Sequence, residues 1–229
     1  MINANDASET ARKLLETELP RRWAHTQGVA RRARGLARVL AQEAELIEVA
    51  AWLHDIGYAS SVASTGFHSL DGARYLRDVL MAPDLLCRLV AHHTGASVEA
   101  EERGMPSISK EFAAPPPELL DALTYCDMTT GVDGTPTDVD YRLAEILTRY
   151  PEDHIVYRSI TRSAPILRHA SRTVEARLAA MGGSHLAAQR CTASRPSAIP
   201  EASIAPRPPA TARWPNSTQS KYGDDGRVR

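Results

Sequence analysis

Hydrophobic residues recur along the first 181 positions at the three- and four-residue spacing of amphipathic helices, and no segment alternates convincingly with the period of two expected of a strand. In PRRWAHTQGVARRARGLARVL, residues 20–40, apolar positions such as Trp23, Val29 and Leu40 follow helical spacing, and the other face is nearly all arginine. The pattern therefore predicts an all-α fold.

Prolines and glycines mark the ends of these helices. Pro20 stops one helix and suits the first turn of the next, where its missing N–H has no helical partner to lose. Gly57 is a candidate C-terminal cap, and a polar loop containing Pro106 interrupts the later helices. The predicted helices cover residues 8–19, 20–40, 43–56, 68–80, 83–93, 117–130, 138–149 and 152–181.

Composition changes near Gly182 and Gly183. The segment that follows is dense in Pro, Ser, Ala and Thr and cannot bury enough apolar surface to offset chain entropy. The sequence therefore predicts a helical domain over residues 1–181 and a disordered tail over residues 182–229.

Bulk composition excludes several classes of protein. A hydrophobic content of 43% suffices for a core, and 27 basic against 28 acidic residues give no overall electrostatic indication of a nucleic-acid or membrane partner. No apolar stretch approaches the ~20 residues of a membrane span, and the N-terminus lacks the pattern of a secretion signal. The three cysteines lack CxxC spacing and are interpreted as reduced thiols. We expect a cytoplasmic protein.

Histidines and aspartates close several of the apolar helical runs. His54 and Asp55 follow one such run, and Asp127 follows another. Imidazole and carboxylate are ligands for metals of borderline hardness, and burying them is costly unless something binds them. Because the candidates come from five predicted helices, the sequence predicts an inward-facing metal site in a bundle. The candidate ligands are His25, His54, Asp55, His68, His92, His93 and Asp127.

The order H…HD…H…HH…D resembles the HD-domain superfamily of metal-dependent phosphohydrolases. The resemblance covers about residues 15–150 and rests on WAHTQGVARRARGLA, AAWLHDIGY, FHSLDGARYL, LVAHHTG and LLDALTYCDM. The chain lacks the GYP-type motif of the cyclic-dinucleotide branch. The segment in which His93 is followed by Thr94 and Gly95 is most similar to the dinucleotide-polyphosphate hydrolase branch.

The resemblance implies a site for two divalent metal ions, drawn from Fe, Mn, Co or Mg. One ion would be held by His25, His54, Asp55 and Asp127. Asp55 would bridge to the second ion, which His68 completes with His92, His93 or both.

The function that this resemblance implies is hydrolysis of a phosphomonoester, a phosphodiester or a nucleotide by metal-activated water, with Asp55 and His54 as catalytic residues. Arg22 and Arg74 are candidates for clamping a distal phosphate, against the simpler hypothesis that they are solvated arginines on helix faces. Two alternatives remain: a di-iron oxygenase of the same superfamily, and a non-catalytic module that binds metal or nucleotide. No P-loop, GxSxG or GxGxxG motif supports another chemistry.

Overall fold

Helices make up the regular structure of residues 2–181, which is the part of the chain that the computed structural model describes. Within this part there are no strands, and Thr130 and Pro136 form an isolated bridge. The all-α prediction is confirmed, whereas the predicted tail over 182–229 lies outside the described residues.

The helices are α1 (Ala4–Leu15), α2 (Pro20–Gly35), α3 (Ala37–Leu40), α4 (Ala44–Leu53), α5 (His68–Asp78), α6 (Asp84–His92), α7 (Ala96–Glu102), α8 (Pro117–Met128), α9 (Val139–Arg149) and α10 (Ile155–Ala180). Short 3-10 turns are η1 (Ala41–Glu43), η2 (Ile56–Tyr58), η3 (His93–Gly95) and η4 (Ile108–Lys110).

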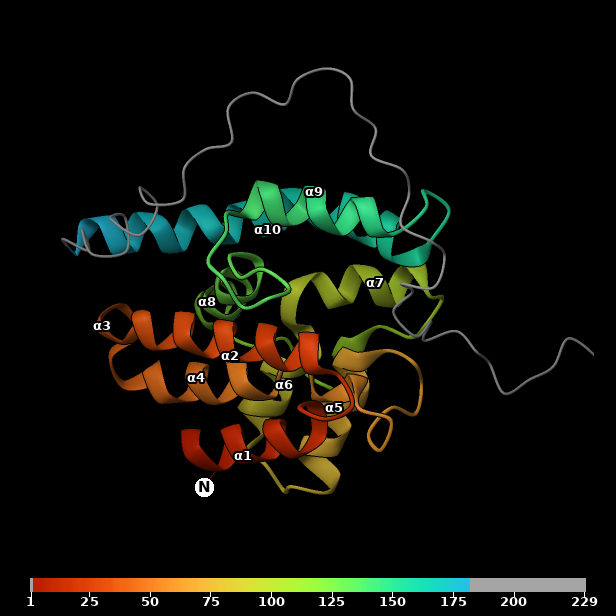
Figure 1. Cartoon of the computed structure of the whole chain (residues 1–229), viewed down its shortest axis with the longest axis horizontal. Helices are drawn as coiled ribbons and strands as arrows, with labels where there is room; N and C mark the ends of the chain where they lie inside the picture. The colour runs from red at the N-terminus through yellow and green to blue at the C-terminus, as the bar shows by residue number, and fades with distance from the viewer. Residues whose placement is uncertain (1, 182–229) are drawn as a thin grey trace, which may run out of the picture. The chain divides into compact units, whose positions relative to one another are not determined.

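The central element of the bundle is α8, which contacts α2, α4, α6, α9 and α10. In Figure 1, α9 and α10 run together along one side of the bundle, and α1, α2 and α4 lie on the opposite side. The main core contains fully buried side chains such as Ile47, Leu53, Leu89 and Leu123. Helix α2 contacts α4 and α8, and α6 contacts the same two helices.

Helix boundaries differ from the prediction where side-chain caps decide them. The first helix starts at Ala4 and not at residue 8, because the Asn3 side chain accepts hydrogen bonds from the main-chain N–H groups of Asn5 and Asp6. The predicted helix over 20–40 is divided at Leu36 into α2 and α3. Pro20 does occupy the first turn of α2, as predicted.

The predicted role of Gly57 as a helix cap is wrong. Helix α4 already ends at Leu53, and Gly57 lies within η2. A β-carbon at Gly57 would lie 1.9 Å from the main-chain oxygen of His68. Glycine is therefore needed because the backbone of α5 approaches so closely, and this approach places His68 beside the end of α4.

The predicted polar loop before α8 contains a helix, α7. Its last turn is acidic, and it is tied to α10 by ion pairs of Glu102 with Arg158 (2.8 Å) and of Glu101 with Arg162 (2.7 Å). These two glutamates therefore join two helices. None of the helices in residues 2–181 has both the length and the apolar character that crossing a membrane would require.

Candidate metal centre

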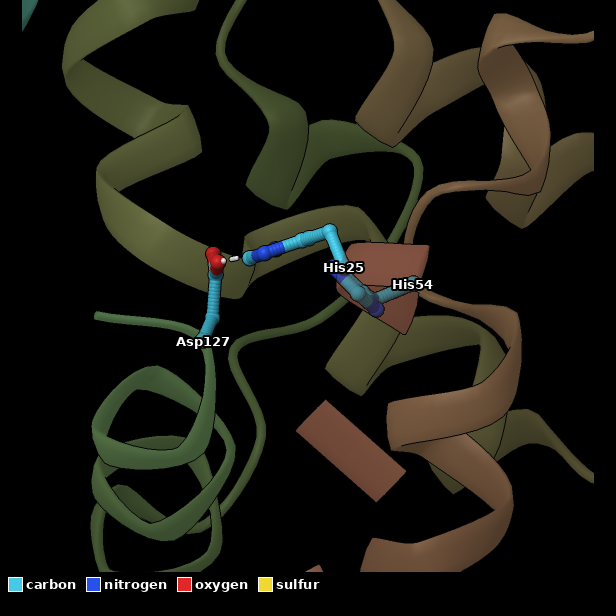
Figure 2. Close-up of side chains that lie close together, drawn as sticks. All are labelled: His25, His54 and Asp127. Carbon is cyan, nitrogen blue, oxygen red and sulfur yellow. Dashed lines mark hydrogen bonds and ion pairs between the residues drawn. The ribbon is translucent and has the colours of Figure 1, made fainter. Parts of the chain in front are cut away.

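Three of the predicted ligands form one buried group, drawn from three helices. Atoms of His25 on α2, His54 at the end of α4 and Asp127 on α8 all lie within 4.8 Å of one another. His25 Nε2 lies 2.9 Å from Asp127 Oδ1, the contact drawn as a dashed line in Figure 2. Each side chain offers one atom of the type that a divalent metal binds.

A second group of the same kind adjoins the first. It consists of Asp55, His68 and His93, whose ligand atoms also lie within 4.8 Å of one another. Asp55 lies between the groups: its Oδ2 is 3.2 Å from His54 Nε2, and its Oδ1 is 3.7 Å from His68 Nε2. A carboxylate that directs one oxygen to each of two ligand groups has the arrangement that a bridge between two metal ions requires.

Three of the histidine rings are oriented by main-chain carbonyl groups. In each ring Nδ1 donates to a carbonyl oxygen, so that Nε2 faces the other ligands, as is typical of metal-binding histidines. In two of them the acceptor lies three residues earlier, where the end of a helix leaves carbonyl groups without helical partners. The pairs are His25 with Gly131 (3.0 Å), His54 with Ala51 (2.8 Å) and His93 with Val90 (2.7 Å).

His54 Nε2 shows that the donor set fits a metal ion. This atom is fully buried and has no hydrogen bond of regular geometry to a described residue, although it lies 3.2 Å from Asp55 Oδ2. A buried polar nitrogen without a partner is costly. A ligated metal ion would remove that cost.

His92 lies outside both groups, although it is adjacent to His93. Its Nε2 donates to the carbonyl oxygen of Phe112 at 2.7 Å, and its Nδ1 lies 3.3 Å from the hydroxyl of Ser97. With both ring nitrogens engaged elsewhere, His92 acts as a connection between the end of α6 and the following segments. The geometry therefore favours His93 over His92 as a ligand.

The two aspartates are held as carboxylates. Burial alone would raise the pKa of Asp55, but attraction to Arg22 and His54 outweighs burial and holds the pKa well below its usual range. At Asp127 the effect of burial is likewise exceeded by the hydrogen bond from His25, and the pKa is lowered. Both carboxyl groups are thus anionic in the protein interior.

Burial acts on the histidines in the opposite direction. It lowers the pKa of His68 and of His93, and in each case a neighbouring histidine lowers the pKa further. At His54 attraction to Asp55 overcomes burial and raises the pKa. His68 and His93 are accordingly neutral near pH 7, the form in which imidazole ligates a metal.

The two candidate phosphate-binding arginines have different surroundings. Arg22 Nη1 lies 2.5 Å from Asp55 Oδ2, and its guanidinium carbon lies 3.6 Å from the centre of the Tyr58 ring. Arg74 is not brought to this site: its guanidinium pairs with Glu111 at 2.6 Å in a more exposed position. Only Arg22 of these two candidates adjoins the ligands.

Thr94 is a site residue that sequence reasoning did not identify. Its hydroxyl donates to Asp127 Oδ2 at 2.5 Å, while the other carboxylate oxygen faces His25. Its backbone has φ 48° and ψ 48°, a left-handed conformation that is unfavourable for a β-branched residue. The only sequence clue was its position directly after His93, because backbone strain leaves no pattern in a sequence.

The turn after α8, which contains Gly134, packs closely against α2 at Gly28. A β-carbon on Gly134 would lie 2.2 Å from the carbonyl oxygen of Ala24, and one on Gly28 would lie 2.5 Å from that of Gly134. The turn is thus pressed against α2, and the carbonyl of Gly131 reaches His25 Nδ1.

We expect Gly134→Ala to lower the free energy of unfolding by about 2–4 kcal/mol, the sum of left-handed backbone strain and a clash with main chain. Gly104→Ala is the matched control, because Gly104 also has positive φ (66°) but nothing lies within 4 Å of an added β-carbon. Urea denaturation of both variants measures the difference. Equal losses would show that the close approach to α2 has no energetic consequence.

The helical fold and the two His/Asp groups define a class of protein: an all-α domain with a candidate buried metal centre. Residues 22–130 match the family model of the HD domain, and this range contains every ligand of both groups. Residues 22–130 therefore form a domain of the HD-domain superfamily. No curated protein sequence and no solved structure is significantly similar to it.

Proposed function

We propose that the chain is a metal-dependent phosphohydrolase acting on a small phosphorylated substrate such as a nucleotide. The observation that carries the proposal is the pair of adjoining ligand groups on either side of Asp55. The HD domain supports it, because that superfamily is one of metal-dependent phosphohydrolases. We further propose a cytoplasmic location, as expected from the sequence.

The ligands divide between two ions. His25, His54 and Asp127 would hold one, His68 and His93 would hold the other, and Asp55 would contribute to both. Divalent ions bound there would supply an activated water nucleophile and positive charge for the phosphoryl oxygens.

The residues around the site would have distinct tasks if metal were bound. Asp55 would provide the anion between two cations, and the main-chain carbonyl groups fix the rings of His54 and His93. The Thr94 hydroxyl fixes the Asp127 carboxylate. Arg22, at the edge of the ligand set, offers a fork of N–H donors that matches phosphate geometry.

A test is phosphate release from a panel of nucleotides, phosphomonoesters and phosphodiesters, with protein reconstituted with Mn²⁺, Co²⁺ or Fe²⁺. The proposal predicts turnover that chelation abolishes and metal restores. Oxygen consumption by a mixed-valent di-iron protein without phosphate release would instead support the oxygenase alternative. Saturable nucleotide binding without turnover in any metal would support a binding module.

We expect Thr94→Ala to weaken metal binding by about 10- to 100-fold, which is typical when a group that orients a ligand is lost. Thr94→Ser is the matched control, since it keeps the hydroxyl that donates to Asp127 and differs from the alanine variant by that group alone. Titration with Mn²⁺ measures the affinity of each. If alanine and serine variants bind equally well, the hydroxyl has no part in orienting Asp127.

A further inference from the structure

Arg22 contacts the carboxylate oxygen of Asp55 that faces His54, a member of the first ligand group. Its Nη1 lies 2.5 Å from Asp55 Oδ2, and this is the same oxygen that lies 3.2 Å from His54 Nε2. The ion pair is shielded from solvent, because the side chains of Arg22 and Asp55 are 15% and 3% exposed. A metal ion ligated by His54 and Asp55 would therefore lie next to the guanidinium.

This ion pair balances a charge that would otherwise be costly. A carboxylate as deeply buried as Asp55 requires a partner of opposite charge. The Arg22 guanidinium, 2.5 Å from Asp55 Oδ2, supplies such a charge. A divalent ion supplies it as well, but two cations beside one buried oxygen repel each other strongly, because screening is weak in the interior.

Arg22 also makes a second contact, which does not involve Asp55. Its guanidinium lies over the ring of Tyr58. The Tyr58 ring also stacks on the ring of His68, with 4.0 Å between centroids and 16° between planes. A cation over a tyrosine face is stabilised by the ring electrons. Arg22 can thus leave Asp55 and remain at the edge of the site, where a phosphate would lie.

We propose that Arg22 competes with metal for Asp55: it is a counter-ion that neutralises this carboxylate and that metal binding displaces towards the substrate phosphate. The inference rests on the proposed metal site and adds a regulation of its occupancy. It follows that the ion pair lowers the affinity for metal, because only the fraction of molecules in which Asp55 is released can bind. Phosphate binding, which retains the displaced guanidinium, would favour metal binding in turn.

The test is the affinity of Arg22→Gln for Mn²⁺, measured by calorimetry on chelator-treated full-length protein. We expect the variant to bind Mn²⁺ about tenfold more tightly than the wild type. Its melting temperature without metal should be lower, because Asp55 has lost its counter-ion. These opposite shifts separate competition from general damage, which would weaken both properties.

Two further variants serve as controls. Arg74→Gln changes the net charge equally but affects only the exposed pair with Glu111, so its Mn²⁺ affinity should equal that of the wild type. Arg22→Lys keeps the charge at Asp55 and should bind Mn²⁺ less tightly than Arg22→Gln. If Arg22→Gln binds Mn²⁺ no more tightly than the wild type does, the proposed competition is wrong. If neither the wild type nor any variant binds Mn²⁺, the proposed metal site itself is wrong.

A crystal structure of the wild type with Mn²⁺ provides a test that needs no variant. We expect the distance from Arg22 to Asp55 Oδ2 to exceed that of a hydrogen bond, with the guanidinium still over Tyr58. An Arg22 that keeps its contact with Asp55 beside bound Mn²⁺ would overturn the proposed competition and leave the metal site intact.

Discussion

Asp55→Ala is expected to reduce turnover of a phosphorylated substrate by on the order of 10³-fold or more, since removing an activating metal abolishes both the nucleophile and the charge stabilisation. The reason lies in the position of Asp55 between the two ligand groups, where its loss removes a ligand from each. Metal content should fall together with turnover. Both are measured on the same preparation, by elemental analysis and by phosphate release.

The control for this variant is a second buried carboxylate. Asp71 is 1% exposed and accepts hydrogen bonds from Ser64, Thr65 and Gly66, but it belongs to neither ligand group. Asp71→Ala should therefore destabilise the fold while the metal content of the folded fraction stays unchanged. Circular dichroism establishes that each variant is folded. A folded Asp55→Ala protein with nearly wild-type turnover would contradict the proposed mechanism.

The adjacent histidines give the second large effect. His93→Ala should lower turnover by on the order of 10²- to 10³-fold, because it removes a ligand from the group that contains Asp55 and His68. His92→Ala should keep turnover within about tenfold of the wild type and lose about 1–3 kcal/mol of stability, because the carbonyl of Phe112 loses its buried donor.

Both variants remove one imidazole from neighbouring positions, so each controls for the other. Metal content, turnover and urea denaturation are measured for the pair. Loss of metal from the His92 variant, with retention in the His93 variant, would reverse the assignment made from the ring contacts.

The location of the site was predictable because its ligands stand at helix ends. Apolar runs that end in His54 or Asp127 are visible in the sequence, and the helix ends of a bundle converge. The choice between His92 and His93 was not predictable, because it depends on which side of α6 faces the other ligands. The His92 ring reaches the carbonyl of Phe112, whereas the His93 ring lies with Asp55 and His68.

The contributions of Arg22, Arg74 and Thr94 show a second limit of sequence reasoning. Arginines on helix faces look alike in a sequence, and only tertiary packing places Arg22 on Asp55 and Arg74 on Glu111. The strained backbone of Thr94 arises from the turn between α6 and α7, a helix that the sequence pattern did not predict.

The number of metal ions bound per chain decides whether His25, His54, Asp55, His68, His93 and Asp127 form a metal centre. The wild-type protein is loaded with Mn²⁺, desalted and analysed for metal and protein in parallel with Asp55→Ala. Two ions per wild-type chain, and fewer than one in the variant, are the predicted result. A wild-type chain that retains no metal would contradict the account of this site as a metal centre.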